Sequence, residues 1–428
     1  MLDTRPRTTT RTRTTVRPAY AVALGLAVLY SGYALARHHS FQTTGFDLGI
    51  FEQAVRSYAA GRWPTADLKG PGFPLLGDHF HPVLALLAPF YAVVPRAETL
   101  LVAQAVLLAV SAIPVTRFAV DRLGRRGVVV GVAYGLSWGL HNTVAFDFHE
   151  VAFAVPLLAF SLEALARERW RPAVTWALPL VLVKEDLGLT VAAIGLYLVW
   201  RGVRRGWAVA AFGVAASAVV VLAVLPAVNP AGGYPYWVRT AETGGLGWLR
   251  LLTAVALLAP TGFLAARSPL LVIALPTLAW RFASGNPAYW GIEHHYSAVL
   301  MPVVFLAFLT ANPRRVWICA TVTAAFTLAL LLRPPHQPTW DEGRRATAAG
   351  VLAMIPDDAH VAASNRLAPH LTGRCRVSLF PADAEWLVVS RPSHWPTTPD
   401  EEDRLVKKAS ATHRVVAEAD HVILLRRR

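Results

Sequence analysis

The stretch AYAVALGLAVLYSGYALA, residues 19–36, decides the fold class, because it contains no charged side chain. An α-helix of about 20 apolar residues is long enough to cross the hydrocarbon core of a bilayer. The preceding residues 1–18 are rich in arginine and threonine, and His38-His39 follows where a cleaved signal peptide would carry small residues. We therefore predict an uncleaved first membrane span, preceded by a basic cytoplasmic tail over residues 1–18.

The composition extends this prediction to most of the chain. Of the 428 residues, 54% are hydrophobic and 16% are charged, and the mean hydropathy is +0.41. A soluble domain of this length needs far fewer apolar residues. We predict an α-helical polytopic membrane protein, with about 11 transmembrane helices within residues 19–333. The predicted spans are 19–36, 98–118, 127–145, 151–166, 172–183, 187–200, 207–227, 248–265, 269–283, 296–311 and 314–333.

Arginines in the short loops orient these spans, because cytoplasmic loops are enriched in lysine and arginine. A cytoplasmic N-terminus in a plasma membrane places the arginines at 122–126, 167–171, 201–205 and 314–315 inside. The net charge of +14 is spread over such loops and the termini. It therefore indicates how the spans are oriented in the membrane, and it does not predict a nucleic-acid partner. The assignment requires that residues 82–95 do not cross. With about 13 residues between its prolines, this segment suits an interfacial or re-entrant helix.

The composition changes after residue 333, where two prolines precede charged and polar sequence. We predict a small α/β domain over residues 334–428, which the same topology makes extracytoplasmic. Roughly 95 residues are enough for a modest core. The predicted strands are 360–364, 377–380, 386–390 and 421–425, and the predicted helices are 341–354 and 400–411.

Acids and histidines gather in the segments that this topology places outside, starting with the outer loop 37–97. Ionisable groups bordering membrane spans are costly unless they face water, a partner or a ligand, so we expect them to converge on one outward cavity. The candidate site residues are Asp47, Glu52, Asp78, His79, His81, Asp147, His149, Glu150, Lys184, Glu185, Asp186, Tyr289, Trp290, Glu293, His294, His295 and Tyr296.

Each group has a structural interpretation beside the functional one. Asp47 could act as a general base or could cap a helix by accepting from free backbone N–H groups. The alternation of His79 and His81 suits a divalent metal ion, but hydrogen-bonded structural histidines are an equally simple interpretation. The residues considered as metal ligands are Asp78, His79, His81, Glu150 and Glu293.

The run Lys184-Glu185-Asp186 lies between two short apolar segments. A lysine there could bind a phosphate as a point charge, or it could form a self-neutralising pair at a helix break. The aromatic and polar segment 286–296 could form a sugar- or headgroup-binding surface or an aromatic belt at the membrane interface. Motifs of nucleotide hydrolysis and of serine hydrolases do not occur in a persuasive context.

Several of these motifs together resemble a family of predicted bacterial membrane proteins of unknown function. The resemblance covers almost the whole chain, so it is specific, although the family itself has no established activity. It is carried by FDLGIFEQ at 46–53, GDHFHP at 77–82, FHE at 148–150, KED at 184–186, HYSA at 295–298, IPDDA at 355–359, SN at 364–365 and PHL at 369–371.

The layout more distantly resembles the GT-C superfamily of lipid-linked glycosyltransferases. That resemblance implies a catalytic acid in the loop after the first span, a place that Asp47 occupies, and a basic residue near the donor phosphate, a place that Lys184 occupies. The chain departs from the pattern because no acidic pair flanks Asp47. The histidines at 79, 81, 294 and 295 are also not a general feature of the superfamily.

The resemblance implies an enzyme that moves a sugar from a polyprenyl-phosphate donor in the membrane to an extracytoplasmic acceptor, with membrane lipids as partners. A transporter or lipid flippase, or a non-catalytic envelope assembly protein, remains the alternative. The clustering of acids and histidines on one predicted face, without an obvious inverted repeat, favours the enzyme. The sequence does not identify the sugar, the acceptor, the metal or the oligomeric state.

Overall fold

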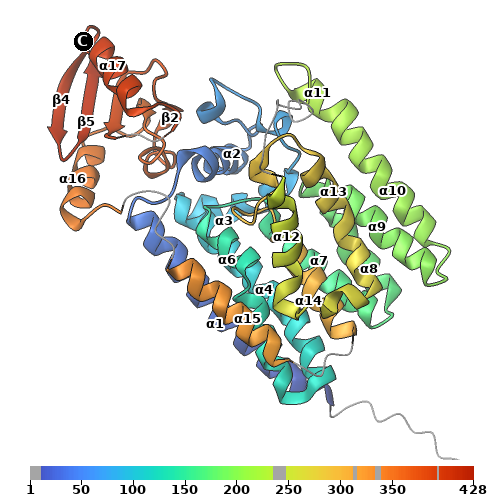
Figure 1. The fold of residues 1–428 in the computed structure, drawn as a ribbon. Coiled ribbons are helices and arrows are strands. Elements are labelled where there is room, and N and C mark those ends of the chain that lie inside the picture. The colour runs from blue at the N-terminus through green and yellow to red at the C-terminus, as the bar shows by residue number, and fades with distance from the viewer. Residues whose placement is uncertain (1–10, 235–246, 312–315, 333–338, 393–394) are drawn as a thin grey trace, which may run out of the picture.

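The computed structural model describes residues 11–234, 247–311, 316–332, 339–392 and 395–428. Figure 1 shows a long bundle of helices with a small α/β domain at one end. Most of the predicted basic tail, residues 1–10, lies outside the described residues. The predicted fold, a helical membrane domain followed by a small C-terminal α/β domain, is confirmed.

The first helix, α1 (Arg11–His39), packs along α4 (Ala97–Leu123). The last residue of α1, His39, lies 3.6 Å from Glu98 in the first turn of α4. The intervening outer loop therefore begins and ends at the same end of the bundle. This geometry is the one expected if the segment η4 (Pro82–Leu87) and α3 (Ala88–Val93) does not cross the membrane. The orientation of the ends relative to the cytoplasm stays a prediction.

The described residues contain three helical segments that are long and apolar enough to span a membrane: Val16–His39, Ala97–Gly135 and Gly206–Val228. After α4 the membrane domain is divided into shorter helices, many of them apolar, and several of these belong to the second and third of these segments. They are α5 (Gly127–Gly135), α6 (Trp138–Ala145), α7 (Val151–Ala166), α8 (Trp170–Ala177), η6 (Leu178–Leu182), α9 (Leu187–Trp200), α10 (Gly206–Val219), η7 (Val220–Val224), α11 (Leu225–Val228), α12 (Trp248–Leu258), η9 (Ala259–Thr261), η10 (Leu264–Arg267), η11 (Pro269–Ala274), α13 (Leu275–Ala283), η12 (Pro287–Tyr289), α14 (Leu300–Thr310) and α15 (Trp317–Leu331).

Several predicted spans are interrupted, and two of them show the cause. The segment 127–145 breaks into α5 and α6 because Ser137 takes an extended conformation, with φ −62° and ψ 146°. The break frees the carbonyl of Gly135, which accepts a hydrogen bond from Tyr30 of α1. The segment 172–183 narrows to a 3₁₀ helix around Pro179, which has no N–H to donate.

Helix α14 forms the core of the membrane domain. Its residues from Leu300 to Leu309 are all buried, and it packs mainly against α7 and the η10–η11 segment. A helix that is apolar on every side needs neighbours all round it. The bundle therefore surrounds α14.

The C-terminal domain contains a five-stranded sheet in the order β2-β1-β3-β5-β4. Its parallel half pairs β1 (His360–Ala363) with β2 (Arg376–Leu379) and β3 (Trp386–Ser390). Its antiparallel half pairs β5 (Val422–Arg427) with β3 and with the edge strand β4 (His413–Ala419).

The helices of this domain are α16 (Glu342–Ala353) and α17 (Pro399–Ala409). The sequence analysis missed strand β4 because most of its residues are exposed and it lacks the expected alternation of apolar and polar side chains.

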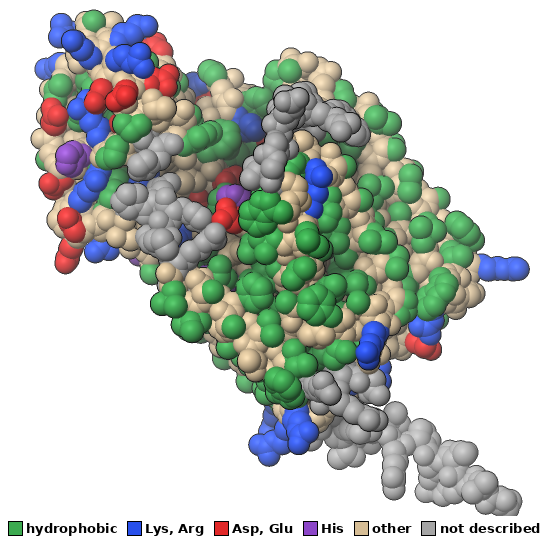
Figure 2. Space-filling model, in the orientation of Figure 1, with side chains coloured by type: hydrophobic (Ala, Val, Ile, Leu, Met, Phe, Trp, Pro, Cys, Tyr) green, Lys and Arg blue, Asp and Glu red, His purple; other side chains and the backbone are tan. Residues whose placement is uncertain are grey.

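The C-terminal domain rests on the outer loop through α2 (Ile50–Ala59). Gln53 Nε2 donates to the carbonyl of Val377 over 2.7 Å, and Arg56 donates to the carbonyl of Cys375 over 2.7 Å. Figure 2 shows apolar side chains covering much of the helical bundle. Charged side chains crowd the C-terminal domain, and further basic side chains lie toward the opposite end of the bundle.

Candidate functional site

The turn before α2 carries Asp47 in an unusual backbone conformation. Residues Gly45–Gly49 form a π-type turn, η1, in which Asp47 has φ +134° and ψ −77°. A residue with a side chain adopts this region only at a cost of about 1–3 kcal/mol, and such strain clusters at functional sites. Gly49, not Asp47, precedes α2, and no side chain caps that helix. The structure therefore does not support the capping interpretation of Asp47.

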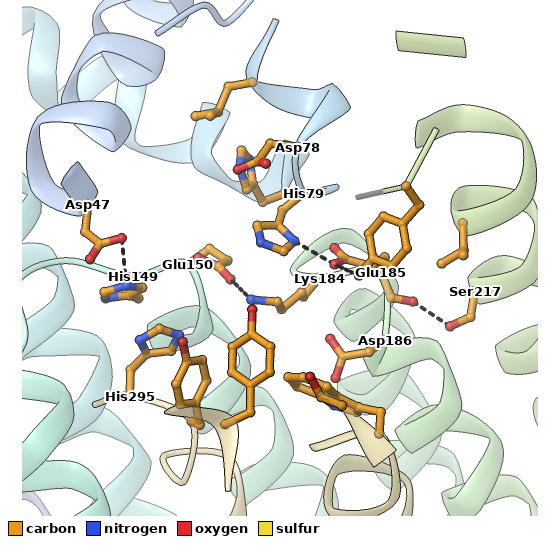
Figure 3. A pocket seen from close by; sticks show the side chains of 18 of the residues that line it. Asp47, Asp78, His79, His149, Glu150, Lys184, Glu185, Asp186, Ser217 and His295 are labelled. Carbon is orange, nitrogen blue, oxygen red and sulfur yellow. Dashed lines mark hydrogen bonds and ion pairs between the residues drawn. The ribbon is translucent and has the colours of Figure 1, made fainter. Parts of the chain in front are cut away.

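The carboxylate of Asp47 faces the imidazole of His149, with Oδ1 3.4 Å from Nε2 (Figure 3). His149 is buried and stacks on His295, with ring centroids 3.6 Å apart. Burial, followed by the adjacent His149, lowers the pKa of His295 well below its usual value. His295 is therefore a neutral surface against which His149 and Asp47 are held.

The segment carrying His149 is fixed by a glutamine inside α4. Gln104 Oε1 accepts from the N–H of His149 over 2.9 Å, and Gln104 Nε2 donates to the carbonyl of Asp147. Asp147 in turn accepts from the N–H and the hydroxyl of Thr44, over 2.8 and 2.7 Å. Burial raises the pKa of Asp147 to about 6 despite these bonds. Asp147 thus fixes Thr44, the residue directly before the Asp47 turn.

Lys184 and Glu150 form an ion pair at the centre of the site, 2.8 Å apart (Figure 3). They come from the break between η6 and α9 and from the residue preceding α7. Burial raises the pKa of Glu150, but Lys184 and nearby histidines outweigh burial and hold it at about 2. Burial lowers the pKa of Lys184, and Glu150 and Glu185 outweigh this effect and raise it. Both partners therefore stay charged at neutral pH.

Glu185 lies on the far wall and collects donors from several segments. Its carboxylate lies 2.7 Å from His79 Nδ1 and accepts from Tyr234 OH over 2.9 Å, while its carbonyl accepts from Ser217 Oγ over 2.6 Å. Burial opposes ionisation of both partners, but their mutual attraction outweighs it: the pKa of His79 is raised and that of Glu185 is lowered. The pair joins the outer loop to the start of α9.

These groups line one cavity of about 790 Å³. Figure 3 shows Asp47 and His149 on one side, Lys184 in the middle and Glu185 with Ser217 on the other side. The sequence-predicted residues that line it are Asp47, Asp78, His79, His81, His149, Glu150, Lys184, Glu185, Asp186, Tyr289, His295 and Tyr296.

Five predicted residues do not line the cavity: Glu52, Asp147, Trp290, Glu293 and His294. Glu52 is buried beneath the C-terminal domain, where Tyr91 and the hydroxyl of Thr372 donate to it. Trp290 lies beneath the guanidinium of Arg250, 3.9 Å from its ring centroid. Twelve of the seventeen candidate residues therefore converge on the cavity, and these five do not.

Three of the five candidate metal ligands are engaged in ion pairs with other side chains. Asp78 pairs with Lys69 at 2.6 Å, and His79 and Glu150 belong to the pairs described above. Within the described part of the chain, no three His, Cys, Asp or Glu side chains group closely enough to hold one ion. The divalent cation stays a prediction, for which these residues form no ready ligand set.

The cavity also contains residues that the sequence did not single out. Lys69 resembles an ordinary basic loop residue, Arg250 lies in the first turn of α12, and Ser217 lacks any motif. Leu189 and Val221, from α9 and η7, give the wall an apolar side. A polar residue within an apolar helix was the one available signal for Gln104, which supports the site from α4.

The family described as "Predicted membrane protein (DUF2079)" matches residues 37–424, so the chain belongs to that family. Among curated proteins, none matches. The structure is similar to the crystal structure of ArnT from Cupriavidus metallidurans bound to undecaprenyl phosphate, with a TM-score of 0.57 and 14% identity. The similarity covers 94% of this chain and 98% of ArnT. The GT-C-like fold expected from the sequence is confirmed.

Proposed function

We propose that this member of the DUF2079 family is a GT-C-like membrane glycosyltransferase. It would move a sugar from a polyprenyl-phosphate donor to a hydroxyl acceptor on the extracytoplasmic side. The observation that carries the proposal is Asp47, a strained carboxylate that ends in a large cavity beside buried cations. The fold similarity to ArnT, solved with undecaprenyl phosphate, supports the same class of lipid.

The cavity offers complementary walls to such a donor. Leu189 and Val221 provide apolar contact for the start of a prenyl chain. Lys184 has three N–H donors, of which one reaches Glu150. Arg250, whose guanidinium stacks on Trp290, is a second cation on the lining. We propose that these two cations hold the donor phosphate, because a phosphate leaving group needs positive charge as it departs.

Asp47 would supply the general base. In the transfer, the acceptor oxygen bonds to the anomeric carbon while the bond from that carbon to the phosphate oxygen breaks. The acceptor proton passes to Asp47, and polyprenyl phosphate leaves with the bonding electrons. His149 orients the carboxylate, and general-base assistance of this kind contributes about 10²–10⁴-fold. Asp78 and Tyr289 lie on the lining where sugar hydroxyls could bond.

The test is lipid profiling of a deletion strain complemented with variants. Asp47→Asn keeps the shape and removes the basicity, so we expect the same polyprenyl-phosphate sugar to accumulate as in the deletion strain. The control is Asp383→Asn, which changes an exposed carboxylate of the C-terminal domain. It should give the wild-type profile. A wild-type profile with membrane-inserted Asp47→Asn would overturn the base assignment.

A flippase would also accumulate its lipid on deletion, so a second measurement separates transfer from transport. The accumulated lipid is extracted and incubated with purified protein in detergent micelles, which have no two sides, together with a heat-treated envelope extract that supplies the hydroxyl acceptor. Release of free polyprenyl phosphate by wild-type protein, but not by Asp47→Asn, supports the transferase. If no polyprenyl-linked sugar accumulates in the deletion strain, the donor class is wrong.

A further inference from the structure

The Asp47 turn is bonded to the C-terminal domain by one residue, Asn365. This asparagine follows strand β1 and stands 319 residues further along the chain than Phe46. Its carbonyl accepts from the N–H of Gly45 over 2.7 Å, and its side-chain Oδ1 accepts from the N–H of Phe46 over 2.8 Å. The two bonds fix the backbone directly before the strained residue.

The surfaces around this contact are closely fitted. A Cβ atom added to Gly45 would come 2.6 Å from Cβ of Ala368, nearer than side-chain atoms approach one another. The ring of Phe46 meets Trp395 edge-on, with centroids 4.6 Å apart. The first turn of the candidate site is thus packed against the domain, with no room for a side chain at Gly45.

The conformation of Asp47 requires such support. A non-glycine residue keeps φ +134° only where the surrounding structure over-determines it. Thr44, bonded to Asp147, fixes the beginning of the turn from the membrane domain. Asn365 fixes the next two amides from the C-terminal domain. The direction of the Asp47 carboxylate is therefore set by both domains together.

We propose that Asn365 is a positioning residue for Asp47, and that the C-terminal domain thereby completes the candidate site. The proposal rests on the proposed function, because it gives Asp47 the role of base. It predicts that loss of the Asn365 side-chain acceptor lowers kcat and leaves the KM for the donor nearly unchanged, because Lys184 and Arg250 lie on other elements.

The test compares Asn365→Leu, which has similar size and no acceptor, with Asn365→Asp, which keeps an acceptor oxygen. Arg376→Leu is the matched control, because Arg376 bonds Asp67 across the same interface without touching the Asp47 turn. The first measurement is hydrogen exchange of the peptide containing Phe46. The second is the turnover of the polyprenyl-phosphate sugar extracted from the deletion strain, measured in the detergent assay described above and with the same acceptor.

For Asn365→Leu we expect faster exchange at Phe46 and a kcat about tenfold lower, the equivalent of one lost hydrogen bond. Asn365→Asp should keep the exchange rate at Phe46 and kcat near their wild-type values, and Arg376→Leu should change neither quantity. Equal results for Asn365→Leu and Arg376→Leu, or faster exchange with an unchanged kcat, would overturn the proposal. If Asn365→Leu does not insert, Asn365→Ala deletes the acceptor without adding bulk and carries the same expectation.

The two proposals fail in different ways. Full turnover by Asp47→Asn refutes the base assignment whatever Asn365 does. An inactive Asp47→Asn together with a fully active Asn365→Leu refutes only the positioning role. The exchange measurement is independent of turnover and reports directly on the hydrogen bond.

Discussion

Replacing Lys184 by methionine separates the stability of the site from its function. The substitution removes the positive partner of Glu150 and keeps a side chain of similar length. The side chain of Lys184 is 12% exposed and that of Glu150 is 2% exposed, so water cannot replace the lost partner. We therefore expect Lys184→Met to destabilise the fold as well as to weaken binding of a phosphate.

The size of the effect follows from the pKa of Glu150. The pKa of Glu150 is about 2 in the folded protein, against an ordinary value of 4.5; this net result of burial, Lys184 and nearby histidines corresponds to about 3 kcal/mol. Because the folded pKa is depressed, this contribution is fully present above pH 4.5 and is lost as the pH falls through 2. Removal of one partner from a buried pair costs about 3–5 kcal/mol, a range that includes this value.

The assay is denaturant unfolding in detergent micelles at pH 7, with a double-mutant cycle. Lys184→Met combined with Glu150→Gln should recover most of the lost stability, because the neutral amide leaves no unpaired buried charge. Arg201→Met is the control. It breaks the partly exposed pair with Glu168 and should cost at most about 1 kcal/mol.

A Lys184→Met protein as stable as Arg201→Met, with no gain from adding Glu150→Gln, would refute the reasoning. The double variant also isolates the functional role of the lysine. If it is stable and binds undecaprenyl phosphate as wild type does, Lys184 is a structural partner only. Weakened binding by a stable double variant supports the phosphate contact.

Three further predictions concern the outer loop. Burial raises the pKa of Glu52 to about 7 despite hydrogen bonds from Thr372 and Tyr91. The folded protein therefore favours the protonated carboxyl, and its contribution to the free energy of unfolding is fully present below pH 4.5. About 3 kcal/mol of that contribution is lost as the pH rises through 7. Unfolding at pH 5 and pH 8 should show that loss in wild type and not in Glu52→Gln. Gly45→Ala should loosen the C-terminal domain, measured by limited proteolysis, whereas Gly350→Ala, with open space around it, should not. A reporter fused after residue 126 should read cytoplasmic and one fused after residue 428 external; an external signal at 126 means that residues 82–95 cross.

Hydrophobic length predicted the simple helices well. The predicted segments 151–166 and 187–200 coincide with α7 and α9, because both are predominantly apolar runs bounded by charged residues. The break between α5 and α6 was not predictable by the same rule. The carbonyl that the break frees accepts a hydrogen bond from Tyr30, more than 100 residues earlier in the chain, and hydropathy does not detect a tertiary contact of that kind.

The candidate site, too, was predictable from the sequence only in part. The cost of ionisable groups beside membrane spans correctly directed attention to Asp47, Lys184 and Glu185, which meet in one cavity. That argument does not distinguish a residue facing the cavity from one holding the backbone behind it, and Asp147 is of the second kind. It also overlooks Arg250, because this residue lies at the start of a predicted span, where an arginine is common in any membrane protein.

The two walls of the cavity are built differently, and this difference bears on how the site works. Lys184 and Glu185 are adjacent in sequence at one helix break, and the side chains that hold them, Glu150, His79 and Ser217, all lie outside the C-terminal domain. The position of Asp47 depends on contacts with His149, on the bond between Thr44 and Asp147, and on Asn365 of the C-terminal domain.

A shift of the C-terminal domain would therefore move the base while leaving the cation wall in place. Donor binding and proton transfer are then separable properties of the fold. In the proposed mechanism, a lipid phosphate would then bind before the domain completes the reactive geometry. An acceptor that brings the domain onto the turn would thereby help to assemble the site that acts on it.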